Sequence, residues 1–338
     1  FCLYGSAYGI LKRTGGRIVI VLFHYIHFST IQNHPENEMT DPVLLGIDLG
    51  ATKLSWSLFD REGKVLRNNR VQLNDRTGKD VGSLIVREIS SLLKVGTSGI
   101  ASIGVCVPGI YRTASGPVWA PNIPGWDDYP LFQEIKNSCG SIPVQIDNDR
   151  ACSLMGEQWK GRAKNVRDAL FLAVGTGIGL GILSDGTIIR GSQDIAGSIG
   201  WSTFDRNYDP KYASCGFFEY HASGAGLAKV ANDCIAGQPG YKGILRHPKE
   251  TSLTAQDVFN AFELDDPIAR EVIRDFIQLW GMATANLISL FNPECLIFGG
   301  GVFGPAVKFI PEIHQAALKW AQPLSMKKAS FEASALGS

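Results

Sequence analysis

The chain has 338 residues, 45% of them hydrophobic, and its 32 basic residues balance 32 acidic ones to a formal net charge of zero. A chain of this length can bury the cores of two domains. With this balance, nothing basic enough stands out to indicate nucleic acid as the main partner, and we expect none. Seven cysteines are scattered without a Cys-x-x-Cys pair, which favours reduced thiols in a cytoplasmic protein.

The first 38 residues do not match the rest of the chain. They begin with Phe1 and contain an apolar run, residues 17–28, which is shorter than the about 20 residues that a membrane span needs. The run resembles the core of a signal peptide, but no clear small-x-small cleavage site follows it. We interpret residues 1–38 as an extension outside the domains, disordered or not native, with Met39 as the natural start. We expect no membrane partner.

Residues 44–66 are predicted to form three strands joined by two tight turns. An apolar run ends at Asp48, turns through residues 50–52, continues to Phe59 and turns again at Gly63. Residues 170–191 repeat this pattern, with turns at 175–177 and 184–186. Apolar runs broken by glycine-rich turns are typical of hairpins. Two copies of one meander indicate a duplicated fold with a site between the copies.

The first turn of each meander has residues suited to binding phosphate. Glycines let backbone N–H groups approach a ligand closely, and successive N–H groups form an anion-binding nest. Thr52 and Thr176 add hydroxyl donors, and Lys53 adds positive charge. Asp48 offers an oxygen ligand suited to hydrated Mg²⁺. Two ordinary glycine hairpins are the alternative, but the matched pair favours phosphate binding.

The periodicity of apolar residues predicts further elements along the chain. Helices are expected at residues 80–95, 131–138, 150–160, 222–231, 267–291 and 311–321, and strands at 100–105, 143–146 and 295–298. With the two meanders they predict an α/β protein with two domains. We place these at residues 39–146 and 147–338, the second cut short at its end.

Polar residues follow the strand predicted at 143–146. Asp147, Asn148 and Asp149 end this strand and open a helix, and ligands of such sheets bind at the carboxyl ends of the strands. Alternatively, Asn148 or Asp149 only caps the helix. The position of the segment between the two phosphate turns favours function. Gly299-Gly300-Gly301 follows another strand, where it either lets a ligand lie against the backbone or allows close packing at a helix entry.

Several motifs, in the same order along the chain, resemble those of the ROK family (repressors, open reading frames and sugar kinases). They correspond to its first phosphate motif, sugar-side loop, catalytic Asn-Asp pair, second phosphate motif and adenosine-side glycines. The matching segments are Asp48-Leu49-Gly50-Ala51-Thr52-Lys53, Pro121-Asn122 with Gly125-Trp126, Asn148-Asp149, Gly175-Thr176-Gly177-Ile178-Gly179 and Gly299-Gly300-Gly301. The resemblance runs from about residue 44 to the end.

This resemblance implies an actin-like ATPase fold, in which two ribonuclease-H-like domains close on ATP and a sugar across a cleft. It implies that Asp149 is the catalytic base, a role that suits a carboxylate within reach of a hydroxyl. It also implies that Asn122, Asn148 and Glu219 hold sugar hydroxyls. ATP and Mg²⁺ are the expected cofactors, a sugar is the expected partner, and a homodimer is compatible with the family.

The chain departs from the family at Ser198 and Trp201, where sugar kinases of the family usually have Glu and His. The family's His also ligates zinc, and here only Cys215 stands near the expected cysteine cluster. Since a structural zinc site needs four ligands, we expect no zinc and treat His221 as a surface or packing residue. Trp201 could lie along a sugar ring, or it could pack in the core beside Phe204.

Our leading interpretation is an ATP-dependent hexose kinase, glucokinase-like in its choice of sugar. A kinase for fructose, mannose or an amino sugar is the alternative within the enzymes. From another class, the chain could be a sugar-responsive transcription regulator or a sugar-binding protein without catalysis. Both Asp48 and Asp149 are present, which favours an active enzyme.

Overall fold

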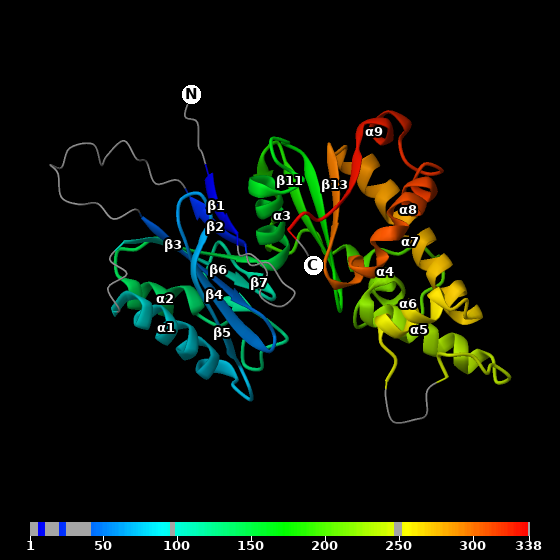
Figure 1. The fold of residues 1–338 in the computed structure, drawn as a ribbon, viewed down its shortest axis with the longest axis horizontal. Coiled ribbons are helices and arrows are strands. Elements are labelled where there is room, and N and C mark those ends of the chain that lie inside the picture. The colour runs from blue at the N-terminus through cyan, green and yellow to red at the C-terminus, as the bar shows by residue number, and fades with distance from the viewer. Residues whose placement is uncertain (1–5, 11–19, 25–41, 95–98, 247–251, 337–338) are drawn as a thin grey trace. The chain divides into compact units, whose positions relative to one another are not determined.

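The computed structural model describes residues 6–10, 20–24, 42–94, 99–246 and 252–336 (Figure 1). The chain divides into two compact units: unit 1 comprises Phe1–Lys164 and Gly191–Ile195, and unit 2 comprises Asn165–Arg190 and Ala196–Ser338. We expected a boundary after Ile146, whereas unit 1 also contains the helix that follows this residue and the short segment Gly191–Ile195.

The sheet of unit 1 has five strands in the order β5-β4-β3-β6-β9. The first three form the predicted antiparallel meander, and β6 and β9 run parallel to β3. The strands are β3 (Val43–Leu49), β4 (Lys53–Phe59), β5 (Val65–Gln72), β6 (Ile100–Val107) and β9 (Val144–Asn148).

Two helices cover one face of this sheet, and a third helix shares the other face with a hairpin of residues 6–10 and 20–24. Leu45, Ile47 and Leu49 alternate along β3 toward a core that they share with α1 (Gly78–Lys94) and α2 (Leu131–Cys139). Asp48 points to the opposite face, because successive side chains of a strand alternate. On that face lies α3 (Asp149–Lys160) (Figure 1).

Two small hairpins complete the described part of unit 1. The strands β1 (Ser6–Ile10) and β2 (Ile20–His24) pair antiparallel within the segment that we expected to lie outside the domains, and Met39 is outside the described residues. The other pair is β7 (Ile110–Tyr111) and β8 (Val118–Trp119). Thr113, between these strands, donates its N–H and hydroxyl to the buried carboxylate of Asp194, at 3.1 and 2.7 Å.

The sheet of unit 2 repeats the topology of the first, in the order β12-β11-β10-β13-β14. Again the first three strands form an antiparallel meander and the other two run parallel to its first strand. The strands are β10 (Ala169–Val174), β11 (Ile178–Ser184), β12 (Thr187–Ile188), β13 (Cys295–Gly299) and β14 (Ser330–Ala333). The duplication that the two meanders predicted is therefore present in the sheets.

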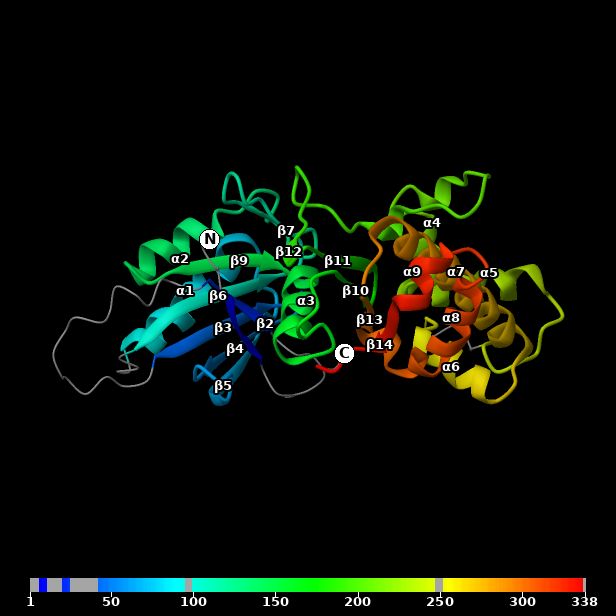
Figure 2. The same cartoon turned by 90° about the horizontal axis from the view of Figure 1, so that it is seen from above.

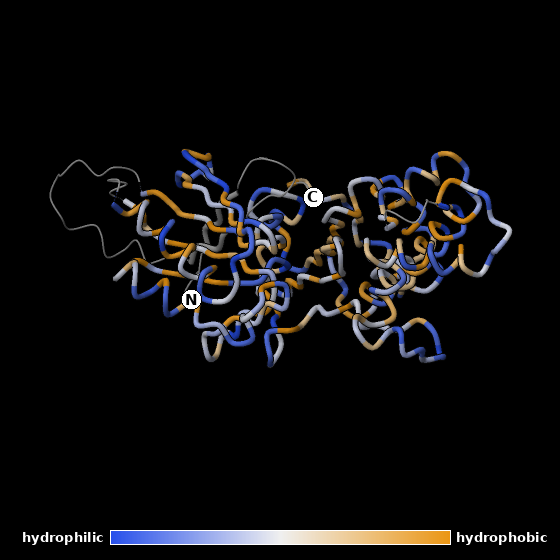
Figure 3. Tube along the Cα trace, turned by 90° about the horizontal axis from the view of Figure 1, so that it is seen from below, coloured by the Kyte–Doolittle hydropathy of each residue, from blue (hydrophilic) through white to orange (hydrophobic). Residues whose placement is uncertain are grey.

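Helices of unit 2 gather on one side of its sheet (Figure 2). They are α4 (Phe217–Ala222), α5 (Gly224–Gly237), α6 (Ala255–Glu263), α7 (Pro267–Phe291), α8 (Ile310–Ala317) and α9 (Pro323–Lys328). Hydrophobic stretches recur along the trace of each unit (Figure 3). The helix α7 has the predicted bounds, whereas the helix expected at 222–231 is α5, which begins after its cap Ser223 and continues to Gly237; the short helix α4 precedes it. No helix in the described part of the chain has the length and apolar character of a membrane span.

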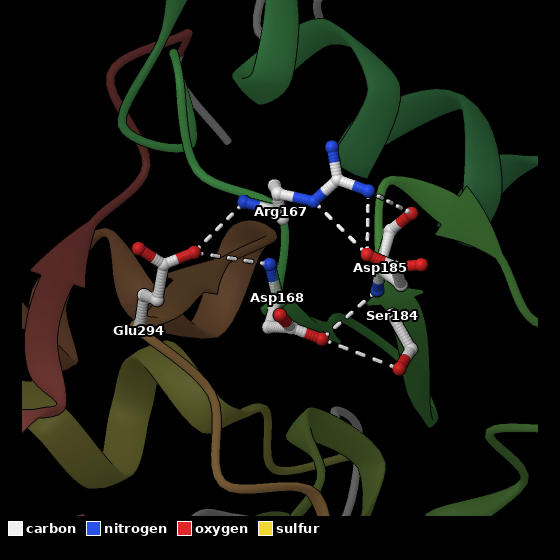
Figure 4. A network of polar contacts seen from close by, with 5 residues as sticks. All are labelled: Arg167, Asp168, Ser184, Asp185 and Glu294. Carbon is white, nitrogen blue, oxygen red and sulfur yellow. Dashed lines mark hydrogen bonds and ion pairs between the residues drawn. The ribbon is translucent and has the colours of Figure 1, made fainter. Parts of the chain in front are cut away.

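A polar network ties together the amino end of β10, the β11–β12 turn and the start of β13 (Figure 4). One oxygen of Glu294 accepts the N–H groups of Arg167 and Asp168. Asp168 in turn accepts the N–H of Asp185 and the hydroxyl of Ser184, and the Arg167 guanidinium pairs with Asp185. These residues lie at the opposite end of β10 from the turn at 175–177, so their role is to hold the strands together.

Candidate active site

The predicted site residues fall into two sets, one in each unit. Unit 1 carries Asp48, Gly50, Thr52, Lys53, Asn122, Asn148 and Asp149, and unit 2 carries Gly175, Thr176, Gly177, Ser198, Trp201, Glu219, Gly299, Gly300 and Gly301. Each set is described within its own unit.

The first glycine turn of unit 1 connects β3 to β4. Its ends are joined by a hydrogen bond from the N–H of Gly50 to the carbonyl of Lys53, at 2.8 Å, and the carbonyl of Thr52 accepts the N–H of Leu73. Ala51 and Thr52 are exposed, and within the described chain their N–H groups have no acceptor. Two exposed N–H groups side by side are what an anion-binding turn needs.

Acidic side chains gather beside this turn on the α3 face of the sheet. Asp48 is paired with Cys106 on β6, which is paired with Asp147 on β9, so the three side chains share one face. A hydrogen bond with the Cys152 thiol, together with burial, raises the pKa of Cys106 well above its ordinary value, and the charges of Asp48 and Asp149 act in the same direction. The thiols are therefore neutral beneath the carboxylates.

Asn148 and Asp149 have different positions at the start of α3. Asn148 is the N-cap, and its side-chain oxygen accepts the N–H of Ala151 at 2.9 Å. The capping alternative therefore holds for Asn148, whose amide NH₂ can still donate to a ligand. Asp149 is the first residue of the helix and is exposed. A carboxylate here is favoured by the helix dipole and is accessible to a substrate hydroxyl.

The predicted sugar-side loop lies against the end of β6. A Cβ at Gly109 would lie 2.1 Å from the carbonyl oxygen of Trp119, so only glycine allows this contact. Asn122 is exposed in the loop. Trp126 is 1% exposed, stacks on Tyr129 at 4.5 Å and donates its indole N–H to a backbone carbonyl. It anchors the loop and leaves Asn122 as its polar, accessible residue.

The second glycine turn connects β10 to β11 in unit 2 and is held from two sides. Its ends are joined by a bond from the N–H of Gly175 to the carbonyl of Gly177, at 3.0 Å. The first N–H groups of α5, from Gly224 and Ala225, donate to the carbonyls of Gly175 and Thr176, at 2.8 and 3.2 Å. The N–H groups of Thr176 and Gly177 have no acceptor in the described chain. Like the turn of unit 1, this turn therefore leaves two successive N–H groups available to an anion.

Gly299, Gly300 and Gly301 lie next to this turn at the end of β13. Gly299 is paired with Ala173 on β10. Gly300 has a φ of +87°, and a Cβ there would lie 2.4 Å from the carbonyl oxygen of Val174. Gly301 is exposed, with open space around it. Close packing therefore explains the first two glycines, and only Gly301 has room for a ligand.

Glu219 on α4 lies directly against the turn. Its Oε2 accepts the N–H of Ile178 at 2.7 Å. Burial raises the pKa of Glu219 above its ordinary value, and the Ile178 N–H and the charge of Lys229 oppose this shift. Gly200 packs on the same side chain, since a Cβ on Gly200 would lie 2.9 Å from the Cβ of Glu219.

Ser198 and Trp201 frame a short 3₁₀ turn, Ile199–Trp201, and both are exposed. The Trp201 side chain is 59% exposed, so it is not part of the core. Phe204 makes edge-to-face contacts with Phe217 and Phe218 instead, at 6.4 and 5.2 Å. The core-packing alternative for Trp201 is therefore wrong.

His221, the histidine near Cys215 in the sequence, packs among aromatic residues. Its Nε2 shares a hydrogen bond with the hydroxyl of Tyr212 at 3.0 Å, and its ring contacts Phe217 and Tyr220. Burial lowers the pKa of His221, and the charge of Lys211 lowers it further. Within the described ranges, no group of three or more His, Cys, Asp or Glu side chains is arranged to hold a metal. The absence of zinc stays a prediction.

Two features of the site were not predicted from the sequence. Asp147 is 2% exposed, and its carboxylate accepts the N–H of Asn148 at 2.8 Å. The signal available was its place in the run of three polar residues. The other feature is the start of α5, where Ser223 caps the helix and Gly224 contacts the turn. A Ser-Gly pair before a helical stretch is a recognisable cap signal.

The sequence matches known proteins along most of its length. A model described as the ROK family matches residues 44–336. A glucokinase of Halalkalibacterium halodurans is 30% identical over 309 residues, which is 88% of this chain and 92% of that protein. A xylose repressor of Caldicellulosiruptor bescii is 30% identical over 267 residues, or 76% of this chain and 65% of the repressor.

Solved structures show the same fold. A ROK family transcriptional regulator, described as a homolog of the E. coli MLC protein, has a TM-score of 0.77 at 24% identity over 87% of this chain and 74% of its own. A ROK family glucokinase of Streptomyces griseus, in complex with glucose and AMPPNP, has a TM-score of 0.66 at 24% identity over 87% and 95%. The expected actin-like ATPase fold is confirmed.

Proposed function

The chain belongs to the ROK family, and on that premise we propose that it is an ATP-dependent hexose kinase, glucokinase-like in its acceptor. The observation that carries the proposal is the place of Asp149. Its exposed carboxylate stands at the carboxyl end of β9 and opens α3, in the sheet that also carries the Asp48 turn. A binding protein would not require a base at this position.

In the proposed reaction, Asp149 accepts the proton of a sugar hydroxyl. The hydroxyl oxygen forms a bond to the γ-phosphorus of ATP as the bond to the departing ADP oxygen breaks. Asn148, Asn122 and Glu219 hold the other sugar hydroxyls. Ser198 and Trp201 line the sugar side, and Trp201 offers an aromatic face to the ring.

The two glycine turns and Lys53 bind the phosphates. The N–H groups of residues 51–52 and 176–177, which have no acceptor in the described chain, stabilise charge on the transferring phosphoryl group, and Gly301 leaves room for the adenosine side. Asp48 fits a hydrated Mg²⁺, because this ion is usually held by one or two carboxylates, waters and substrate phosphates. Bound with the nucleotide, Mg²⁺ would neutralise phosphate charge.

The test is phosphorylation of a hexose panel with ATP and Mg²⁺, comprising glucose, fructose, mannose and amino sugars. We expect turnover with glucose, and Asp149→Asn should lower it by about 10²-fold or more. Because Asn148 supplies the cap of α3, the variant should stay folded, with a melting temperature close to that of the wild type. Near-normal turnover of Asp149→Asn at saturating sugar would contradict the proposal, as would no turnover with any sugar.

A sugar-responsive regulator is the second candidate, because a xylose repressor and a transcriptional regulator are among the similar proteins. A regulator binds sugar without turning it over. Calorimetric sugar binding by a protein that phosphorylates none of the panel would favour this candidate. Preference for another sugar over glucose would instead identify a kinase for fructose, mannose or an amino sugar.

A further inference from the structure

Glu219 contacts both the phosphate turn of unit 2, residues 175–177, and a second loop of this unit, residues 197–201, which carries Ser198 and Trp201. On one side, its Oε2 accepts the N–H of Ile178, the first residue after the turn, at 2.7 Å. On the other side, Gly200 of the loop lies so close that a Cβ there would be 3.0 Å from the same Oε2. A single side chain therefore contacts the segments that the proposed function assigns to two different ligands.

The space at Gly177 shows how tightly the carboxylate is fitted. A Cβ at Gly177 would lie 2.6 Å from Oε2 and 3.3 Å from Oε1 of Glu219. A Cβ at Gly175, two residues earlier in the same turn, would meet nothing within 4 Å. Neither glycine has a φ in the left-handed region. Gly177 is thus required by the carboxylate and not by the backbone conformation of the turn.

The position of Glu219 also has an electrostatic consequence. Its carboxylate is half-buried beside a turn whose N–H groups at 176 and 177 face no acceptor in the described chain. A negative charge next to an anion-binding turn opposes phosphate binding, and the effect is large where solvent screening is weak. A hydroxyl that donates to the carboxylate spreads this charge and so reduces the repulsion.

We propose that Glu219 is a positioning residue that couples the two ligands of unit 2, with Oε2 holding the phosphate turn and Oε1 receiving a sugar hydroxyl. The inference rests on the proposed function. Bound sugar raises the affinity for the nucleotide, and by thermodynamic linkage bound nucleotide raises the affinity for the sugar by the same factor, which we call the coupling factor.

Calorimetry with D-glucose and with MgADP, each alone and in the presence of the other, measures this coupling. In the wild type, each ligand should raise the affinity for the other by about fivefold or more. Gly177→Ala should displace the Glu219 carboxylate, lower the affinity for glucose and bring the coupling factor close to one. Gly175→Ala is the matched control: it alters the same turn without touching Glu219. Its own affinity for MgADP is free to change, because Gly175 belongs to the phosphate turn, but the factor by which each ligand changes the affinity for the other should stay that of the wild type. Equal coupling factors in the two alanine variants would overturn the proposal.

Hydrogen exchange of the Ile178 amide gives a readout that needs no ligand. The amide should be protected in the wild type and in Gly175→Ala, and should exchange faster in Gly177→Ala and Glu219→Ala. Exchange in the wild type as fast as in Glu219→Ala would show that the carboxylate does not hold the turn. If the wild type bound neither glucose nor MgADP, the proposed function would fail, while the exchange pattern would still decide whether Glu219 positions the turn.

Discussion

Single residues decide what this site presents to a sugar, and Trp201 is the clearest case. Its ring is 59% exposed, beside a segment whose backbone packs on Gly216 and on the side chain of Glu219. An exposed tryptophan next to a polar acceptor is suited to a ligand with one apolar face and several hydroxyls, as a sugar has. Ser198, also exposed, offers a single hydroxyl.

Trp201→Phe should therefore affect sugar binding and not stability. We expect it to remove most of the sugar-induced change in tryptophan fluorescence and to raise KM for the sugar more than it lowers kcat. KM for ATP should stay nearly unchanged. Steady-state kinetics, fluorescence titration and a thermal melt check these outcomes. Unchanged sugar KM and unchanged fluorescence on adding sugar would instead mean that Trp201 lies outside the sugar site.

At the scale of elements, the start of α7 is held by a buried carboxylate. Asp266 is 3% exposed and precedes Pro267. Its Oδ1 accepts the N–H groups of Ile268 and Ala269, at 3.0 and 3.1 Å. Its Oδ2 accepts the hydroxyl of Tyr241 and a further backbone N–H. One carboxylate therefore caps the helix and anchors the loop that precedes α6.

Asp266→Ala should destabilise the protein by about 2–4 kcal/mol, because it removes a cap and leaves buried donors without partners. Thr254→Ala is the matched comparison. Thr254 caps α6 through a capping box whose bonds are exposed, so its loss should cost only about 1 kcal/mol. Urea unfolding of both variants measures the difference. Equal losses of unfolding free energy would show that burial of the Asp266 network adds nothing.

At the scale of the whole molecule, the two five-stranded sheets have the same strand order, and each unit has its own hydrophobic core. The strands β1 and β2 pair with each other and belong to neither five-stranded sheet. The two larger sheets are therefore complete without a strand from the first 38 residues.

A protein that starts at Met39 should accordingly fold and function like the full chain. We expect a cooperative thermal transition and the same sugar phosphorylation per mole of protein. Circular dichroism and the hexose assay, run in parallel on both forms, are the measurements. If the shorter form failed to fold, the segment at 17–28 would belong to the core of unit 1.

Much of the fold could be predicted because its signals are local. The glycine turns after Asp48 and Val174 and the length of α7 follow from apolar periodicity and turn residues within a few positions of each other. The place of Asp149 could also be predicted, because a carboxylate that follows a strand and opens a helix is visible in three consecutive residues. Its role as a base is what the resemblance to the ROK family implied.

Contacts between distant segments could be decided only by the tertiary structure. The bond from Ile178 to Glu219 spans 41 residues, and the turn at 175–177 is held by Gly224 from another helix. The sequence left Trp201 equally suited to the core and to the surface, because an aromatic residue serves in both. Its exposure depends on which neighbours fill the core, and Phe204 with Phe217 and Phe218 does so. Periodicity reports which face of a segment is apolar, but the packing of remote segments determines what that face meets.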